Sequence, residues 1–159
     1  MEETECLVSK GRRACSAAHW LLLAAVAISA AFLAAAVVET MGSVSRYGIP
    51  TGADADRLMS IVAIIAVVVL MDCVVRRIRA GVPPFAEENA GAFLLMAAVV
   101  LMKAVLSVIV QAAIFFADTG FGKSFLFPID AIMAGGVFLV LYMIFKYGST
   151  LQAEVQDLV

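Results

Sequence analysis

Three ionisable residues lie inside long apolar stretches of the chain: Asp72, Lys103 and Asp130. A charged side chain is costly to place in hydrocarbon, so such residues are by default candidates for a functional site. Ser107 and Gln111 follow Lys103 at i+4 and i+8, which puts the three on one face of a helix. The chemistry open to this set is ion pairing, hydrogen bonding between helices, or an ion path.

Lys103 is expected to pair with Asp72. Side chains of a helix lean toward its N-terminus, and that end of the third apolar segment adjoins the end of the second that carries Asp72. Arg76 is an i,i+4 partner of Asp72, so the three charges are predicted to form one network. Two alternatives stay open: an interfacial Asp72–Arg76 pair with Lys103 reaching the headgroups, or a conformational switch or ion path through these charges.

No arrangement of residues typical of catalysis is present. The chain has three cysteines without a C-x-x-C pair and a single histidine, so neither a disulfide framework nor a zinc site is indicated. No nucleophile has a base beside it, and no glycine-rich loop could cradle a phosphate. We therefore expect no enzymatic activity, no cofactor and no metal ligand. His19 and Trp20 are interpreted as membrane-interface anchors.

The composition points to a membrane protein. Hydrophobic residues make up 64% and charged residues 15% of the 159 positions, whereas soluble domains have about 25% charged residues. The apolar runs are continuous, which excludes a barrel, and about 20 helical residues span the bilayer core. The sequence predicts an all-α polytopic membrane protein with four transmembrane helices, at about 17–38, 58–75, 90–117 and 125–145. A cleavable signal peptide is the alternative for the first segment.

Polar segments flank and connect these spans. Residues 1–16 are expected to form a cytoplasmic N-terminal segment, residues 17–147 the transmembrane domain, and residues 148–159 a cytoplasmic tail. A connection rich in glycine and proline is predicted at 39–57, and a tight loop at 118–124.

Single residues are predicted to start and stop the helices. Gly81 is expected to end the second helix as a left-handed C-cap, and Asp54 to cap its start. Asp130 lies two residues after Pro128, where a carboxylate stabilises the first turn of the fourth helix.

The basic residues predict the orientation, since cytoplasmic loops are enriched in Lys and Arg. The N-terminus, the central turn and the tail hold seven of them: Lys10, Arg12, Arg13, Arg76, Arg77, Arg79 and Lys146. The opposite side holds three: Arg46, Arg57 and Lys123. Both termini are therefore placed in the cytoplasm. The net charge of −2 argues against direct binding of nucleic acid.

Two polar motifs carry a resemblance to a known family. The central turn contains Gly81-x-x-Pro84-Phe85-x-x-Glu88-Asn89, with one more residue before Pro84 than the family pattern has. The tail contains Phe145-Lys146-Tyr147-Gly148-x-x-Leu151-Gln152-x-Glu154. Together they resemble the G-x-PF-x-x-EN and F-R-x-G-x-x-L-Q-x-E motifs of a bacterial family of small four-helix membrane proteins catalogued as a domain of unknown function. The resemblance covers about residues 15–159.

Members of that family are often encoded beside a small helix-turn-helix regulator of the Xre type. The resemblance therefore implies a protein of the bacterial inner membrane that senses a signal or anchors such a regulator. A central aromatic residue with a charged rim is typical of binding hot spots. The predicted partner-binding residues are Arg76, Arg77, Arg79, Pro84, Phe85, Glu88, Asn89, Gly148, Leu151, Gln152 and Glu154.

Other readings of the same residues stay open. The arginines of the turn can serve only to anchor lipid headgroups, with Pro84 starting the third helix and Phe85 lying in the interface. A small transporter or immunity-type protein would instead act within the bilayer through Asp72, Lys103 and Gln111. Besides the lipid bilayer and a regulator, a homo-oligomeric partner is left open.

Overall fold

The computed structural model describes residues 2–47, 52–117 and 127–156 of the chain. These residues form four helices: α1 (Glu2–Tyr47), α2 (Gly52–Arg79), α3 (Glu87–Ala117) and α4 (Ile129–Gln156). Each helix contains a segment that is long and apolar enough to cross a membrane, at Cys15–Gly42, Asp54–Arg79, Glu87–Ala113 and Ile129–Val155. The predicted all-α architecture with four membrane-spanning helices is confirmed.

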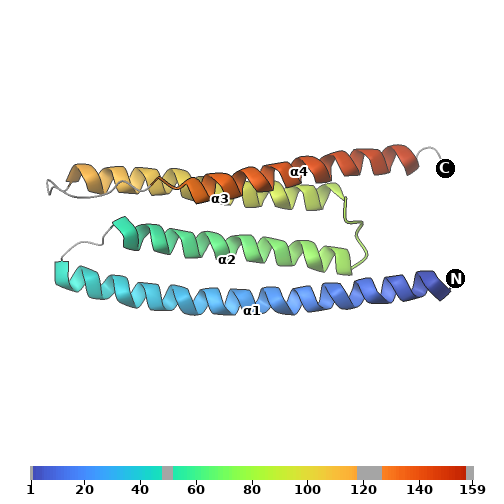
Figure 1. Ribbon diagram of the computed structural model, residues 1–159, viewed down its shortest axis with the longest axis horizontal. Coiled ribbons are helices and arrows are strands. Elements are labelled where there is room, and N and C mark those ends of the chain that lie inside the picture. The colour runs from blue at the N-terminus through green and yellow to red at the C-terminus, as the bar shows by residue number, and fades with distance from the viewer. Residues whose placement is uncertain (1, 48–51, 118–126, 157–159) are drawn as a thin grey trace.

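Consecutive helices run antiparallel, and α3 and α4 overlap in the view of Figure 1. Within the described part of the chain, the backbone of α2 lies close to those of α1 and α3, and the backbone of α4 lies close to that of α3; no other pair of helices comes as near. The α2–α3 loop and the ends of α1 and α4 nearest the chain termini lie at the same end, which we call the loop end. The other end, where α1 leads into α2, is called the far end.

The best-packed part of the protein surrounds α3. Val74 of α2 is buried with Ala92, Phe93 and Met96 of α3, and half-buried side chains of α2 and α4 pack against this cluster. By contrast, α1 exposes large apolar side chains along much of its length, among them Trp20, Leu21 and Phe32. Lipid tails are as apolar as these side chains, so a membrane helix gains little by burying them in protein.

Two segments predicted to lie outside the four spans are largely helical. The predicted connection at 39–57 is shortened, because α1 continues through Tyr47 and α2 begins at Gly52. One glycine inside a helix costs only about 1 kcal/mol, so Gly42 does not end α1. The predicted tail at 148–159 is helical as far as Gln156. The loop predicted at 118–124 lies outside the described residues.

Gly81 ends α2 as predicted. Its φ of 96° is in the left-handed region, its N–H donates to the carbonyl of Ile78 at 3.1 Å, and the N–H of Val82 donates to the carbonyl of Arg77 at 3.1 Å. These two bonds are the Schellman arrangement, which satisfies the last carbonyls of a helix.

Replacing Gly81 by alanine should lower the free energy of unfolding by about 1–2 kcal/mol, because an L side chain is strained at this φ. SDS titration in mixed micelles measures the change. The control is Gly91→Ala, since Gly91 is helical and an added Cβ meets no atom within 4 Å. That change should raise stability by up to about 1 kcal/mol. Shifts of the same sign in both variants would contradict the assignment of the cap.

The start of α4 follows the sequence, and the start of α2 differs from it. Asp130 lies in the first turn of α4 as predicted. Asp54, predicted to cap the second helix from just before it, lies inside the first turn of α2, because that helix begins at Gly52. The N–H of Ile132 donates to the carbonyl of Pro128 at 3.2 Å, so the proline stands immediately before the helix, as expected. Asp130 is exposed there.

Candidate functional site

A group of polar side chains joins α2 to α3 in the far-end half, and we call it the far-end centre. Lys103 is buried, with 7% of its side chain exposed, and its Nζ lies 3.1 Å from Oδ1 of Asp56. Ser107 Oγ donates to the same carboxylate oxygen at 2.5 Å, and Gln111 Nε2 donates to Ser107 Oγ at 3.0 Å. The predicted polar face of α3 therefore packs against α2, with Asp56 accepting from two of its members.

The predicted pair of Lys103 with Asp72 is wrong, and so is the single network with Arg76. Lys103 points toward the C-terminal part of α3, where Asp56 lies on the neighbouring helix. The tilt of the Cα–Cβ bond fixes only the start of a lysine side chain, and four flexible methylene groups follow. In a medium of low dielectric constant, a carboxylate within reach outweighs this small directional bias.

A second group lies toward the loop end, and we call it the loop-end centre. Asp72 is buried on α2; its Oδ1 lies 2.5 Å from Nδ1 of His19 on α1, and its Oδ2 lies 2.7 Å from Nε of Arg76. The i,i+4 pair with Arg76 appears as predicted. His19, however, is a partner of an intramembrane carboxylate and not only an interface anchor.

His19 and Asp56 were not predicted as members of the two centres, although the sequence contains some indication of each. His19 is the only histidine of the chain and lies at the edge of an apolar segment. Asp56 stands two residues before the predicted second span, inside a segment taken for a loop. Because α2 begins at Gly52, Asp56 lies one turn inside the helix and can face α3.

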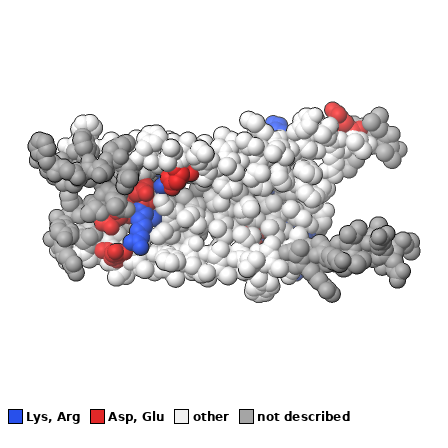
Figure 2. Space-filling model, viewed as in Figure 1, with Lys and Arg blue, Asp and Glu red and all other residues white. Residues whose placement is uncertain are grey.

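The two centres are separate. Asp56 and Asp72 lie sixteen residues apart on α2, which is about 24 Å along a helix. Residues 58–71 of α2 carry no charge. Figure 2 likewise shows charged side chains toward the two ends of the visible face, with an uncharged middle. The loop-end centre joins α1 to α2, and the far-end centre joins α2 to α3. The stretch of α2 between them carries no charged residue.

The loop between α2 and α3 packs on α4, although about sixty positions of the sequence separate them. The rings of Phe85 and Phe145 have centroids 5.3 Å apart, and those of Phe93 and Phe145 are 4.6 Å apart. A Cβ added at Gly148 would lie 2.6 Å from Cδ1 of Phe85. Phe85 therefore rests in the space that the missing side chain of Gly148 leaves on α4.

Two residues predicted to bind a partner instead hold this loop in shape. Asn89 is fully buried, and its Nδ2 donates to the carbonyls of Pro83 and Pro84 at 3.2 Å each. Arg77 Nη1 donates to the carbonyl of Glu88 at 2.9 Å. Asn89 is therefore placed to hold the loop and not to contact a partner, because its side chain is fully buried.

The remaining motif residues form a surface at the loop end, which we call the loop–tail surface. Gly148 and Gln152 are half-buried in it. Lys146, beside it on α4, donates to Tyr142 Oη at 3.2 Å. The exposed members are Arg76, Arg79, Pro84, Phe85, Glu88, Leu151 and Glu154.

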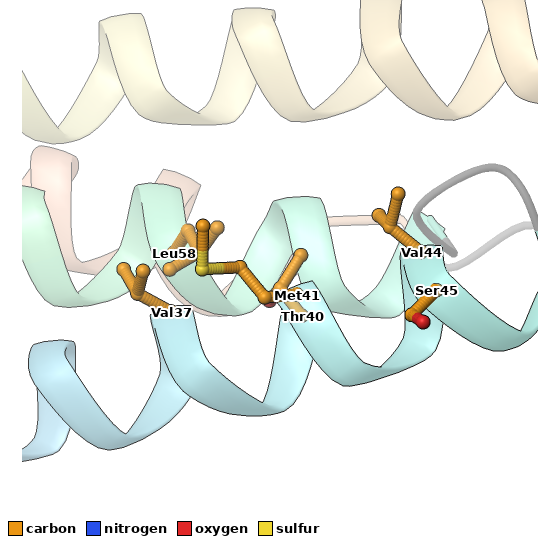
Figure 3. A pocket seen from close by; sticks show the side chains of 6 residues that line it. All are labelled: Val37, Thr40, Met41, Val44, Ser45 and Leu58. Carbon is orange, nitrogen blue, oxygen red and sulfur yellow. The ribbon is translucent and has the colours of Figure 1, made fainter.

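An apolar groove of about 380 Å³ lies between α1 and α2 at the far end (Figure 3). It is lined by Val37, Thr40, Met41, Val44, Ser45 and Leu58. The hydroxyl of Thr40 donates to the carbonyl of Ala36 at 2.8 Å and so serves its own helix. The groove offers apolar surface without an ionisable group. Among the described residues, no group of three His, Cys, Asp or Glu side chains could hold a metal ion.

Comparison with protein families, with characterised proteins and with solved structures finds no match. The fold and the polar centres by themselves define the class: a membrane-spanning protein of four helices in which buried polar side chains bind one another across neighbouring helices. The resemblance to the four-helix family of unknown function stays a prediction from its two motifs.

Proposed function

We propose that the protein is a membrane anchor or sensor that binds a small cytoplasmic regulator at its loop–tail surface. The observation that carries the proposal is the packing of Phe85 on Phe145 and Gly148. It joins the two motifs, which are distant in the sequence, into one surface at one end of the protein. The motif resemblance supports a regulator of the helix-turn-helix type.

The composition of the surface fits a binding site for protein. Phe85 is 42% exposed and Leu151 is 44% exposed, so both present apolar area beyond what they use in packing. Exposed charges of both signs lie at the same end of the protein: Arg76 and Arg79 at the end of α2, and Glu88 at the start of α3. Apolar anchors with a charged rim are the usual design of a hot spot.

The cytoplasmic placement of this surface is part of the proposal. The seven basic residues near the termini and the turn support it by the positive-inside rule. The α2–α3 loop and the start of α1 lie at the same end in Figure 1, so one orientation puts all of them on one side. For a bacterial protein that side faces the cytoplasm across the inner membrane.

A pull-down tests the proposal, with the protein in detergent and the purified candidate regulator as prey. The double variant Glu88→Ala/Leu151→Ala removes two exposed side chains that no described packing needs. Truncation of a hot-spot side chain costs about 2 kcal/mol or more, so the loss of one such contact should lower recovery at least about tenfold. The control is Leu106→Ala, which changes a leucine in the far-end half of α3 that is as exposed as Leu151, at 44%. Equal recovery from the double variant and the control would contradict the proposal.

The far-end centre favours transport within the bilayer as a second candidate, because Lys103 is an intramembrane charge. The geometry supports it less well. Lys103 and Ser107 both bind Asp56, and about 24 Å of uncharged α2 separates Asp56 from Asp72. An ion path would need polar groups across that distance, whereas an anchor needs only the rigidity that paired charges give.

A further inference from the structure

The loop-end centre connects the single histidine of the chain to the loop–tail surface. His19 of α1 and Arg76 of α2 bind the two oxygens of one carboxylate, that of Asp72. Nδ1 of His19 lies 2.5 Å from Oδ1, and Nε of Arg76 lies 2.7 Å from Oδ2. Arg76 is at the same time an exposed member of the loop–tail surface. A change in the charge of His19 therefore reaches that surface through a single carboxylate.

His19 is placed to exchange a proton with water at the loop end. It lies four residues from the Cys15 end of its membrane span, which is about 6 Å along the helix, and 16% of its side chain is exposed. Histidine is the side chain whose ordinary change of charge falls between about pH 5 and pH 8. The neutral ring can donate one hydrogen bond to Asp72, whereas the protonated ring also brings a positive charge beside the carboxylate.

Few other titratable groups lie near this centre in the described part of the chain. Residues 89–102 of α3, which include the side chains packed on Val74 of α2, carry no ionisable group. The backbone of α4 does not lie close to that of α1 or α2. Within four residues of His19 on α1 and of Asp72 on α2, the other titratable or charged side chains are Cys15, Cys73 and Arg76.

Protonation of His19 sets two cations on one carboxylate, and their exposure decides which of them gives way. The charge on His19 stands about twice as far from Arg76 as Asp72 does, so it cancels roughly half of the attraction that holds the guanidinium. Arg76 has 61% of its side chain exposed, whereas Asp72 has 9%. An exposed ion pair contributes little to stability, but a buried charge needs its partner. His19 therefore keeps Asp72, and the guanidinium moves into water.

We propose that protonation of His19 releases Arg76 from Asp72 and so makes the loop–tail surface sensitive to pH. The released guanidinium can bind a carboxylate of the docked partner, because its N–H groups no longer serve Asp72. The partner is then held more tightly at low pH. This consequence rests on the proposed function, whereas the release itself can be measured without a partner.

The Nε–H resonance of Arg76 in the isotope-labelled protein in micelles reports the release directly. Its assignment comes from the peak that disappears in Arg76→Lys. All variants carry serine at the three cysteine positions, so that no thiol titrates. Two substitutions fix the charge at position 19: His19→Gln keeps a hydrogen-bond donor that does not titrate, and His19→Lys keeps a positive charge.

With His19 present, the resonance should move from its bonded to its free position as the pH falls from about 8 to about 5. It should stay at the bonded position in His19→Gln and at the free position in His19→Lys. No shift with His19 present would overturn the proposal. The same shift in His19→Gln would also overturn it, because Asp72 itself would then be the group that titrates.

A pull-down with the purified candidate regulator tests the consequence. Recovery by the chain with His19 should rise about two- to fivefold from about pH 8 to about pH 5.5, because one more exposed charge pair forms. His19→Gln is the control, since an effect of pH on the regulator itself appears in both chains. An equal rise in both would overturn the control of docking by His19. Recovery at neither pH would overturn the proposed function, while the resonance of Arg76 alone decides the release.

Discussion

Replacing Asp56 by alanine is expected to lower the free energy of unfolding by about 3 kcal/mol. The variant leaves the ammonium of Lys103 buried without its carboxylate, and breaking a buried ion pair on one side typically costs about 3–5 kcal/mol. The low end applies because the side chain of Asp56 is itself 35% exposed. The hydroxyl of Ser107 loses its acceptor at the same time. SDS titration in mixed micelles measures the loss.

The matched control is the exposed ion pair at the same end of the protein. Arg57 Nη1 lies 2.6 Å from Oε2 of Glu39, with both side chains more than half exposed. Glu39→Ala should therefore cost no more than about 1 kcal/mol.

A second substitution separates the effect of the charge from that of packing. Asp56→Ala combined with Lys103→Met should recover most of the lost stability, because removing both charges leaves none buried without a partner. If the double variant is as unstable as Asp56→Ala alone, the cost does not come from the unpaired lysine.

The architecture could be predicted because it depends on length and composition. Runs of more than 20 apolar residues have few stable alternatives to a membrane helix. The C-cap at Gly81 could also be predicted from the sequence, because only glycine adopts a positive φ at little cost. The length of α1 could not be predicted. Gly42 resembles a helix breaker in the sequence, but the helix on both sides of it offsets the small penalty.

The partners of the intramembrane charges depend on the register between helices. The sequence does not give this register, so the predicted partner of Lys103 was wrong. Asp56 and Asp72 both lie on α2, but Asp56 was assigned to the preceding connection, so the leaning of side chains left Asp72 as the predicted partner of Lys103. Which helix lies beside Asp72 is a matter of packing order, so His19 of α1 could not be assigned to it from spacing. The juxtaposition of Phe85 with Gly148 likewise follows from α4 packing on α3, which no local motif encodes.

Replacing Gly148 by alanine is expected to lower the free energy of unfolding when Phe85 is present and to raise it when Phe85 is replaced by alanine. In the natural chain the new Cβ would lie 2.6 Å from Cδ1 and 3.0 Å from Cγ of Phe85. The ring must leave its place on Phe145, and such overpacking costs about 1–3 kcal/mol. In a Phe85→Ala background the ring is absent, and Gly→Ala inside a helix should instead raise stability by about 1 kcal/mol.

The change of sign distinguishes a contact between the loop and α4 from a general effect on the helix. Gly91→Ala, in open space on α3, should be stabilising by a similar amount in both backgrounds. Equal effects of Gly148→Ala with and without Phe85 would mean that the loop does not rest on α4, and the loop–tail surface would then not exist. If the sign reverses, Gly148→Ala also becomes the sharpest probe of function. It displaces Phe85 from the proposed docking surface without altering any exposed charge.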